Sequence, residues 1–135
     1  DRAEDIDAAL EHVDAPAFDL ALNGIDCFQS SGKAHTLWAG ISKQPLLAHL
    51  RDKVESAVVR AGCEPERRKF KPHVTLARLR GSTDGARLGA FIQRYNHVTF
   101  GPFPVDSFTL FRSHLGGEKA HYEALVDYPL EPVPA

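Results

Sequence analysis

The sequence predicts an α+β fold in which helices alternate with β-hairpins. Apolar residues recur at helical spacing from Pro45 to Gly62. Residues 18–28 and 35–41 alternate apolar and polar side chains on either side of a Ser-Ser-Gly-Lys turn, as expected for an antiparallel hairpin. Because the helices separate hairpins rather than single strands, antiparallel sheets are favoured over a parallel sheet.

Start and stop signals bound each predicted element. Pro45 suits the first turn of a helix, and Gly62 suits the position after its last turn. Gly24 interrupts the alternation of the first strand, so a bulge or bend is expected there. The predicted helices cover residues 1–13, 45–61 and the segment after the turn at 81–85, and the predicted strands cover 18–28, 35–41, 73–79, 98–112 with a break at Gly101-Pro102, and 120–128.

Composition bounds the class of protein. A chain of 135 residues with 43% apolar content corresponds to one domain, and a net charge of −2 argues against a long nucleic-acid footprint. Cys27 and Cys63 have neither zinc-ligand nor disulfide-framework spacing, so reduced thiols, no metal and a cytoplasmic location are expected. No apolar run approaches the roughly 18 residues of a membrane span, so no membrane partner is expected.

The segment Lys71 to Arg78 carries the most informative pattern. His73 and Thr75 are two residues apart in a segment with strand character, so their side chains are expected on one face. An imidazole and a hydroxyl would then face one cleft, while Val74 and Leu76 would point into a core. Proton transfer on a phosphate ester usually needs one group to take a proton and another to give one. A second histidine is therefore expected.

Basic residues flank this segment. Arg67, Arg68, Lys69 and Lys71 precede His73, and they indicate either a solvated loop or a local contact with nucleic acid. Arg78 lies five residues after His73, an odd offset that would place it on the opposite face of an ideal strand. A bend or the strand end could swing it back toward a phosphate; otherwise Arg78 is an exposed residue at the end of the strand.

An internal repeat bears on the second histidine. Residues 25–28 resemble residues 105–108, and residues 32–35 resemble residues 118–121, which suggests a duplicated helix-plus-hairpin unit or a chance match. The same separation would place the twin of His73 before residue 1. His35 corresponds instead to His121, and its hydroxyl neighbour Thr36 is adjacent rather than two residues away. Of the remaining histidines, His114 could line a cleft, whereas surface positions are expected for His12, His49 and His97.

These residues resemble the 2H phosphoesterase superfamily, specifically the RNA 2′,3′-cyclic phosphodiesterases also called 2′-5′ RNA ligases. The His-x-Thr-Leu-Ala-Arg piece from His73 to Arg78 is the specific part. The other segments, which mainly set the register, are Phe18 to Leu22, Leu37 to Gly40, Gly101 to Phe103 and Leu110 to Ser113.

The resemblance implies two pseudo-symmetric lobes, with antiparallel sheets lining a central cleft and helices outside. It implies a single domain over residues 1–135 that lacks the family's opening strand, a helix and the first His-x-Thr strand, all expected upstream. It also implies metal-independent hydrolysis of RNA 2′,3′-cyclic phosphate ends to 2′-phosphates, without a cofactor. His73 would be one of two catalytic histidines, Thr75 would donate a hydrogen bond to a phosphate oxygen, and Arg78 would bind phosphate. Phe70, Tyr122 and Trp38 are candidates for stacking on a base, although Phe70 and Trp38 also suit a core.

Other functions share these residues. A noncatalytic module could hold an RNA end or a phosphate without cleaving it, and a fragment could be completed by another chain. Ligation in the reverse direction, opening of another cyclic phosphate or cleavage of a 2′-5′ bond would use the same side chains. The expected partners are RNA termini or cyclic nucleotides in each catalytic case.

Overall fold

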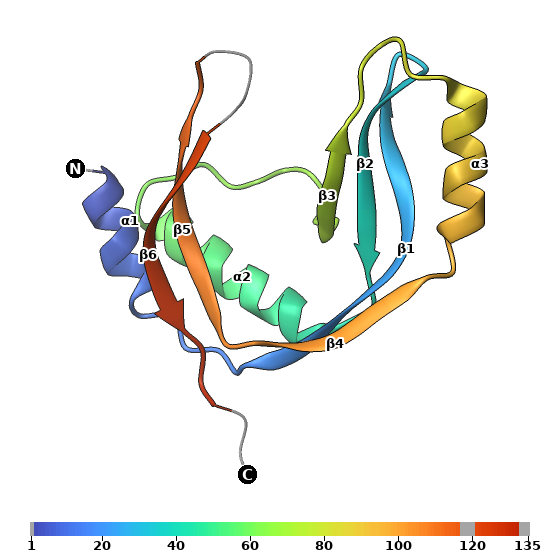
Figure 1. Ribbon diagram of the computed structural model, residues 1–135. Helices are drawn as coiled ribbons and strands as arrows, with labels where there is room; N and C mark the ends of the chain where they lie inside the picture. The colour runs from blue at the N-terminus through green and yellow to red at the C-terminus, as the bar shows by residue number, and fades with distance from the viewer. Residues whose placement is uncertain (1, 117–120, 133–135) are drawn as a thin grey trace. The chain divides into compact units, whose positions relative to one another are not determined.

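A computed structural model describes residues 2–116 and 121–132 (Figure 1). The chain divides into two compact units. Unit 1 contains the described residues of 1–18, 45–68 and 104–135, and unit 2 contains residues 19–44 and 69–103. In the described residues, the helices are α1 (Arg2–Leu10), α2 (Pro45–Arg60) and α3 (Gly85–Tyr95), and the strands are β1 (Phe18–Ser30), β2 (Lys33–Ile41), β3 (His73–Arg78), β4 (Thr99–Val105), β5 (Ser107–His114) and β6 (His121–Pro129).

Unit 2 is built on a four-stranded sheet. Its strand order is β3-β2-β1-β4, and β2 pairs antiparallel with both β1 and β3. Figure 1 shows α3 running alongside β1. Ser31 and Gly32, with φ of 52° and 77°, form the tight turn between β1 and β2, which is the two-residue turn that suits twisted hairpins. The pairing of β1 with β2 shifts between Leu22 and Ile25, so the bulge predicted at Gly24 is confirmed.

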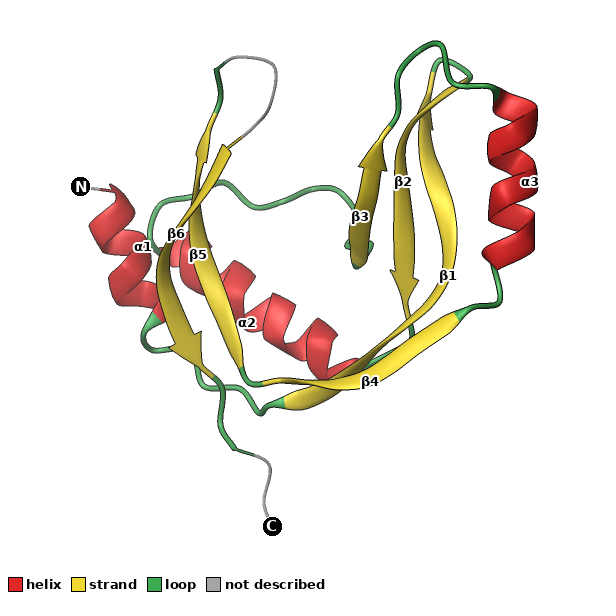
Figure 2. Cartoon of the chain, in the orientation of Figure 1, coloured by secondary structure: helices red, strands yellow, loops and turns green. Residues whose placement is uncertain are grey.

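Unit 1 packs two helices on a β-hairpin. Strands β5 and β6 pair antiparallel, and Leu10 of α1, Ala57 of α2 and Tyr128 of β6 are buried together between the helices and the hairpin (Figure 2). The Tyr128 hydroxyl donates a 2.6 Å hydrogen bond to the Asp7 carboxylate, which ties β6 to α1. Burial and this carboxylate raise the pKa of Tyr128 well above the usual tyrosine value.

The caps follow the sequence signals. Gly62, at φ 105°, follows α2, and the N–H groups of Gly62 and Cys63 donate to the carbonyls of Val59 and Val58. The Asp84 carboxylate accepts from the N–H groups of Ala86 and Arg87 and caps α3.

The predicted α+β fold with antiparallel sheets is confirmed, and two predicted boundaries are wrong. The strand expected over 98–112 does not break at Gly101-Pro102, because β4 continues through them; it breaks at Asp106, where the chain leaves one sheet and enters the other. The first helix ends at Leu10, because the bonds tighten after Glu11: the His12 N–H donates to the Ala9 carbonyl and the Val13 N–H donates to the Leu10 carbonyl. Residues 118–120 of the repeat lie outside the described chain, and the duplication stays a prediction.

Candidate active site

A bulge in β3 places His73, Thr75 and Arg78 on one face of the unit 2 sheet. His73 pairs with Gly40, Thr75 with Trp38 and Arg78 with Thr36, and the register shifts once, between Leu37 and Trp38 of β2. The three partners are alternate residues of β2 and therefore share a face. The shift leaves Leu76 as the extra residue of β3 and offsets the odd spacing of Arg78. The bulge is therefore the bend that the sequence allowed, and Arg78 does not follow the placement of an ideal strand.

The His73 ring is held by a carbonyl and two aromatic rings. Its Nδ1 lies 2.6 Å from the Lys71 carbonyl oxygen, which only accepts hydrogen bonds, so Nδ1 carries the proton in this arrangement. The lone pair of the neutral ring is therefore on Nε2. The ring contacts Phe28 edge to face, with centroids 5.0 Å apart, and its centroid lies 6.0 Å from that of the Trp38 ring. These contacts limit the orientations in which Nε2 can meet a substrate.

Arg78 is oriented by a buried hydroxyl that the sequence did not single out. Its Nη1 donates to Thr36 Oγ1 at 3.1 Å, and that oxygen also lies 2.8 Å from His35 Nδ1. Thr36 is only 1% exposed, so its hydroxyl depends on these partners. His35 thus belongs to the same hydrogen-bond network as Arg78, and its ring centroid lies 6.4 Å from that of Phe28. Its interpretation as a strand-end or hairpin residue outside the catalytic pair stays a prediction. The sequence did contain one signal for Thr36: it lies two residues before Trp38 on a predicted strand, so both side chains are expected on the same face.

The proposed stacking residues occupy different surroundings. Phe70 is partly exposed in the loop before His73. Trp38 is half-buried against Phe28, with ring centroids 5.0 Å apart, and it lies on the face of His73, so its stacking and core interpretations both stay predictions. Tyr122, which is 57% exposed, belongs to unit 1 and pairs with Ser113. A shared site for Tyr122 and His73 stays a prediction.

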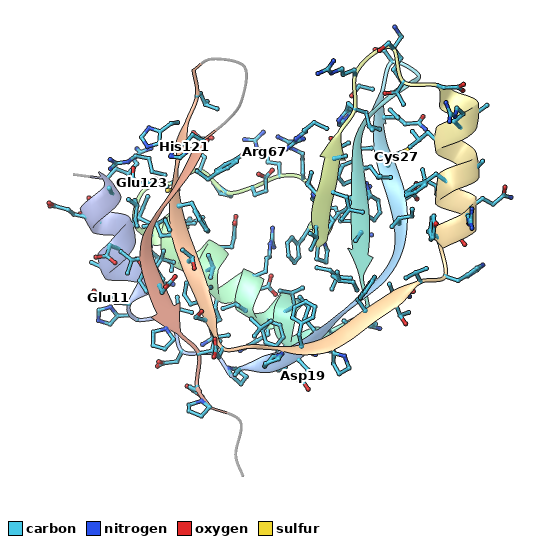
Figure 3. The ribbon with its side chains drawn as sticks, viewed as in Figure 1. Glu11, Asp19, Cys27, Arg67, His121 and Glu123 are labelled. Carbon is cyan, nitrogen blue, oxygen red and sulfur yellow. The ribbon has the colours of Figure 1, made fainter. Side chains whose placement is uncertain are left out.

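The Tyr122 side chain lies on the helix-free face of the β5-β6 hairpin. The register shifts between Leu110 and Phe111, so Tyr122 shares a face with Phe111 rather than with the core residue Leu110. His114 and Glu123 lie on the opposite face of the same hairpin, and His114 Nε2 is 2.9 Å from Glu123 Oε1. The hydrogen bond from His114 lowers the pKa of Glu123. Figure 3 shows Glu123 and His121 on the same strand. His114 is therefore paired with a carboxylate in unit 1.

The basic segment before β3 contains a local ion pair. Arg68 Nε lies 3.7 Å from Glu66 Oε1, and the backbone N–H of Arg68 donates to the same carboxylate oxygen at 3.0 Å. That hydrogen bond lowers the pKa of Glu66. The Glu66 carboxylate therefore offsets part of the positive charge of this segment.

Two features are absent from the described residues. These residues contain no cluster of three or more histidine, cysteine, aspartate or glutamate side chains that could hold a metal ion. None of their helices is long and apolar enough to span a membrane.

The α+β architecture with antiparallel sheets is that of the 2H phosphoesterases. The sequence profile of the 2′-5′ RNA ligase superfamily matches residues 1–117, and the chain therefore belongs to this family, as the resemblance predicted. It is a family of enzymes that includes curated RNA 2′,3′-cyclic phosphodiesterases.

Two curated relatives illustrate the match. The chain is 29% identical to the RNA 2′,3′-cyclic phosphodiesterase of Aeropyrum pernix over 126 residues, which cover 93% of this chain and 72% of the relative. It is 31% identical to the enzyme of that name from Bacillus subtilis over 117 residues, which cover 84% of this chain and 59% of the relative. The chain thus spans only part of the length of these relatives.

Solved structures show the same fold. The crystal structure of E. coli LigT with 3′-AMP superposes with a TM-score of 0.69 at 24% identity, covering 96% of this chain and 68% of LigT. A protein from Thermus thermophilus superposes with a TM-score of 0.69 at 26% identity, covering 94% of this chain and 69% of that one.

Proposed function

We propose that this chain forms part of an enzyme that hydrolyses RNA 2′,3′-cyclic phosphate ends to 2′-phosphates without a metal ion. The observation that carries the proposal is the common face of His73, Thr75 and Arg78, with His73 Nε2 left as the acid-base nitrogen. The names of the relatives supply the substrate class. The site supplies a proton carrier, a hydroxyl donor and a guanidinium, which together suit a cyclic phosphodiester.

The proposed step is an attack of water on phosphorus. One histidine takes a proton from the water, a bond forms between the water oxygen and phosphorus, and the bond from phosphorus to the ribose 3′ oxygen breaks. A second histidine gives its proton to that oxygen, which leaves a 2′-phosphate. His73 would be one of this pair, and its twin is proposed to lie outside these 135 residues. The Thr75 hydroxyl and the Arg78 guanidinium would bind the nonbridging oxygens as negative charge develops.

Substitution of His73 tests this role. In the full-length protein, His73→Ala should lower kcat for a 2′,3′-cyclic phosphate substrate by at least about 10², because one proton transfer is lost. His97→Ala, a histidine of the same unit outside β3, is the matched control and should retain wild-type turnover. Near wild-type turnover by His73→Ala would remove His73 from the mechanism. Tight binding of the substrate by the wild type without turnover would favour the noncatalytic module.

Product and chelator experiments test the finer claims. Phosphorus NMR of the reaction should show a 2′-phosphate, whereas a 3′-phosphate would contradict the proposed leaving group. Activity should persist in excess chelator, because the described residues offer no cluster of metal ligands. Loss of activity that zinc or manganese restores would reverse this proposal. Formation of 2′-5′ bonds from concentrated cyclic phosphate and 5′-hydroxyl ends would demonstrate the reverse reaction.

A further inference from the structure

A small hollow opens at the far end of the unit 2 sheet from His73. It has a volume of about 250 Å³ and lies between the β1-β2 turn, the loop after β3 and the start of α3. Its lining includes Gly32, Lys33, Arg80, Gly81, Thr83 and Leu88. This volume is below the range of about 300–1,000 Å³ typical of drug-sized ligands, so a small group such as a phosphate suits it better than a whole base and sugar.

The chemistry of the hollow favours an anion. Lys33 at the start of β2 and Arg80 in the loop after β3 contribute two positive charges, Thr83 adds a hydroxyl, and no acidic residue belongs to the lining. The nearby Asp84 carboxylate already accepts two hydrogen bonds from the first turn of α3. A Cβ atom built on Gly32 or Gly81 would meet no other heavy atom within 4 Å, so a ligand can approach the backbone there.

The hollow lies just beyond the end of β3 that carries Arg78. Arg80 follows Arg78 by two residues, and the hydrogen bond from Leu79 N–H to the His35 carbonyl extends the pairing beyond β3. An extended chain from His73 to Arg80 spans at most about 23 Å, at about 3.3 Å per residue. A cyclic phosphate closes the 3′ end of an RNA, so the remaining nucleotides all lie on its 5′ side. An RNA that runs along β3 would bring one of its internal phosphates to this hollow.

We propose that Lys33 and Arg80 form a second phosphate site, which binds an internal phosphate of the RNA a few nucleotides 5′ of the cyclic end. This inference rests on the proposed function and adds a substrate class to it: RNA chains are preferred over cyclic mononucleotides. Phosphate contacts by lysine and arginine hold a nucleic acid in position without reading its sequence. The preference should therefore depend on chain length and salt, and not on base identity.

Two substrates separate this site from the catalytic one. We would compare a 2′,3′-cyclic mononucleotide with an octanucleotide that ends in a 2′,3′-cyclic phosphate, using the full-length protein and its Lys33→Ala/Arg80→Ala variant. The variant should lose about tenfold in kcat/KM on the octanucleotide, mainly through KM, and stay within about twofold of wild type on the mononucleotide. The slope of log KM against log salt should also fall by about 0.7, because the contact with one phosphate of a single strand is lost.

A matched variant controls for net charge. Arg87→Ala/Arg94→Ala removes two arginines of α3 that are outside the lining of the hollow, and it should hydrolyse both substrates as the wild type does. Equal loss on both substrates, no loss on the octanucleotide, or the same loss in the control variant would each overturn the second phosphate site. If His73→Ala abolishes hydrolysis but Lys33→Ala/Arg80→Ala does not affect it, this inference fails and the proposed function stands. If His73→Ala keeps its activity, the proposed function fails first.

Discussion

Gly40 offers a sharp test of how the sheet holds His73. It pairs with His73 across β2 and β3. A Cβ atom added at Gly40 would lie 2.7 Å from the Asn23 carbonyl oxygen, at the bulge of β1, and 3.6 Å from a ring atom of Trp38. Real Cβ atoms essentially never come that close to another heavy atom, and the obstacle is backbone rather than a flexible side chain. Gly40→Ala therefore requires β1 or β2 to move.

The expected cost follows from this overlap. Inserting a methyl group into a packed site typically costs about 1–3 kcal/mol, and a backbone obstacle argues for the upper half of that range. Because Gly40 lies opposite His73, the same shift should displace the imidazole. Misplacement of a catalytic group by about 1 Å can cost about 10² in rate, so kcat should fall by about 10-fold to 100-fold.

Gly89→Ala is the matched control for this substitution. Gly89 lies in α3 of the same unit, and a Cβ atom there would meet nothing within 4 Å, so the change should be neutral or stabilise by about 0.5–1 kcal/mol. Urea unfolding gives the free energy of each variant, and steady-state hydrolysis of a cyclic phosphate gives kcat. Equal unfolding free energies for the two variants would refute the steric argument. A destabilised Gly40→Ala protein with unchanged kcat would refute the coupling to His73.

Three further predictions concern hydrogen bonds. Asp84→Ala should lower the unfolding free energy by about 1 kcal/mol in urea, because the cap of α3 is lost, while Asp84→Asn should retain most of it. Tyr128→Phe should cost about 1.5–3 kcal/mol at neutral pH, because a hydrogen bond to the Asp7 carboxylate is removed. The folded state raises the pKa of Tyr128, so its contribution to the free energy of unfolding should be fully present below the ordinary tyrosine pKa of about 10 and should fall as the pH rises above that value. Thermal unfolding measured against pH should show this fall in the wild type and a smaller fall in the Tyr128→Phe variant. Thr36→Val should lower kcat/KM about tenfold, with kcat falling as well, because the hydroxyl that orients Arg78 is lost, and Thr36→Ser should restore both in steady-state assays.

Local patterns predicted the elements better than their pairing. The apolar stripe of α2 and the alternation in β1 are properties of single segments, so the sequence showed them without knowledge of neighbours. The break assigned to Gly101-Pro102 was wrong because β4 keeps its place in the sheet through both residues, and sheet membership depends on the partner strand. The contact of Thr36 was missed for the same reason, because its hydroxyl accepts a hydrogen bond from Arg78, which lies on the neighbouring strand.

The position of β3 explains how one short strand can present three candidate site residues on one face. In the described residues, β3 is an outer strand of its sheet, paired with β2 alone. An outer strand accommodates a bulge with disruption of one ladder, whereas an inner strand would disturb two. The extra residue at the bulge, Leu76, is 51% exposed, and its insertion turns Arg78 onto the face of His73 and Thr75. The odd spacing that counted against Arg78 in the sequence is therefore the spacing that a bulged outer strand requires.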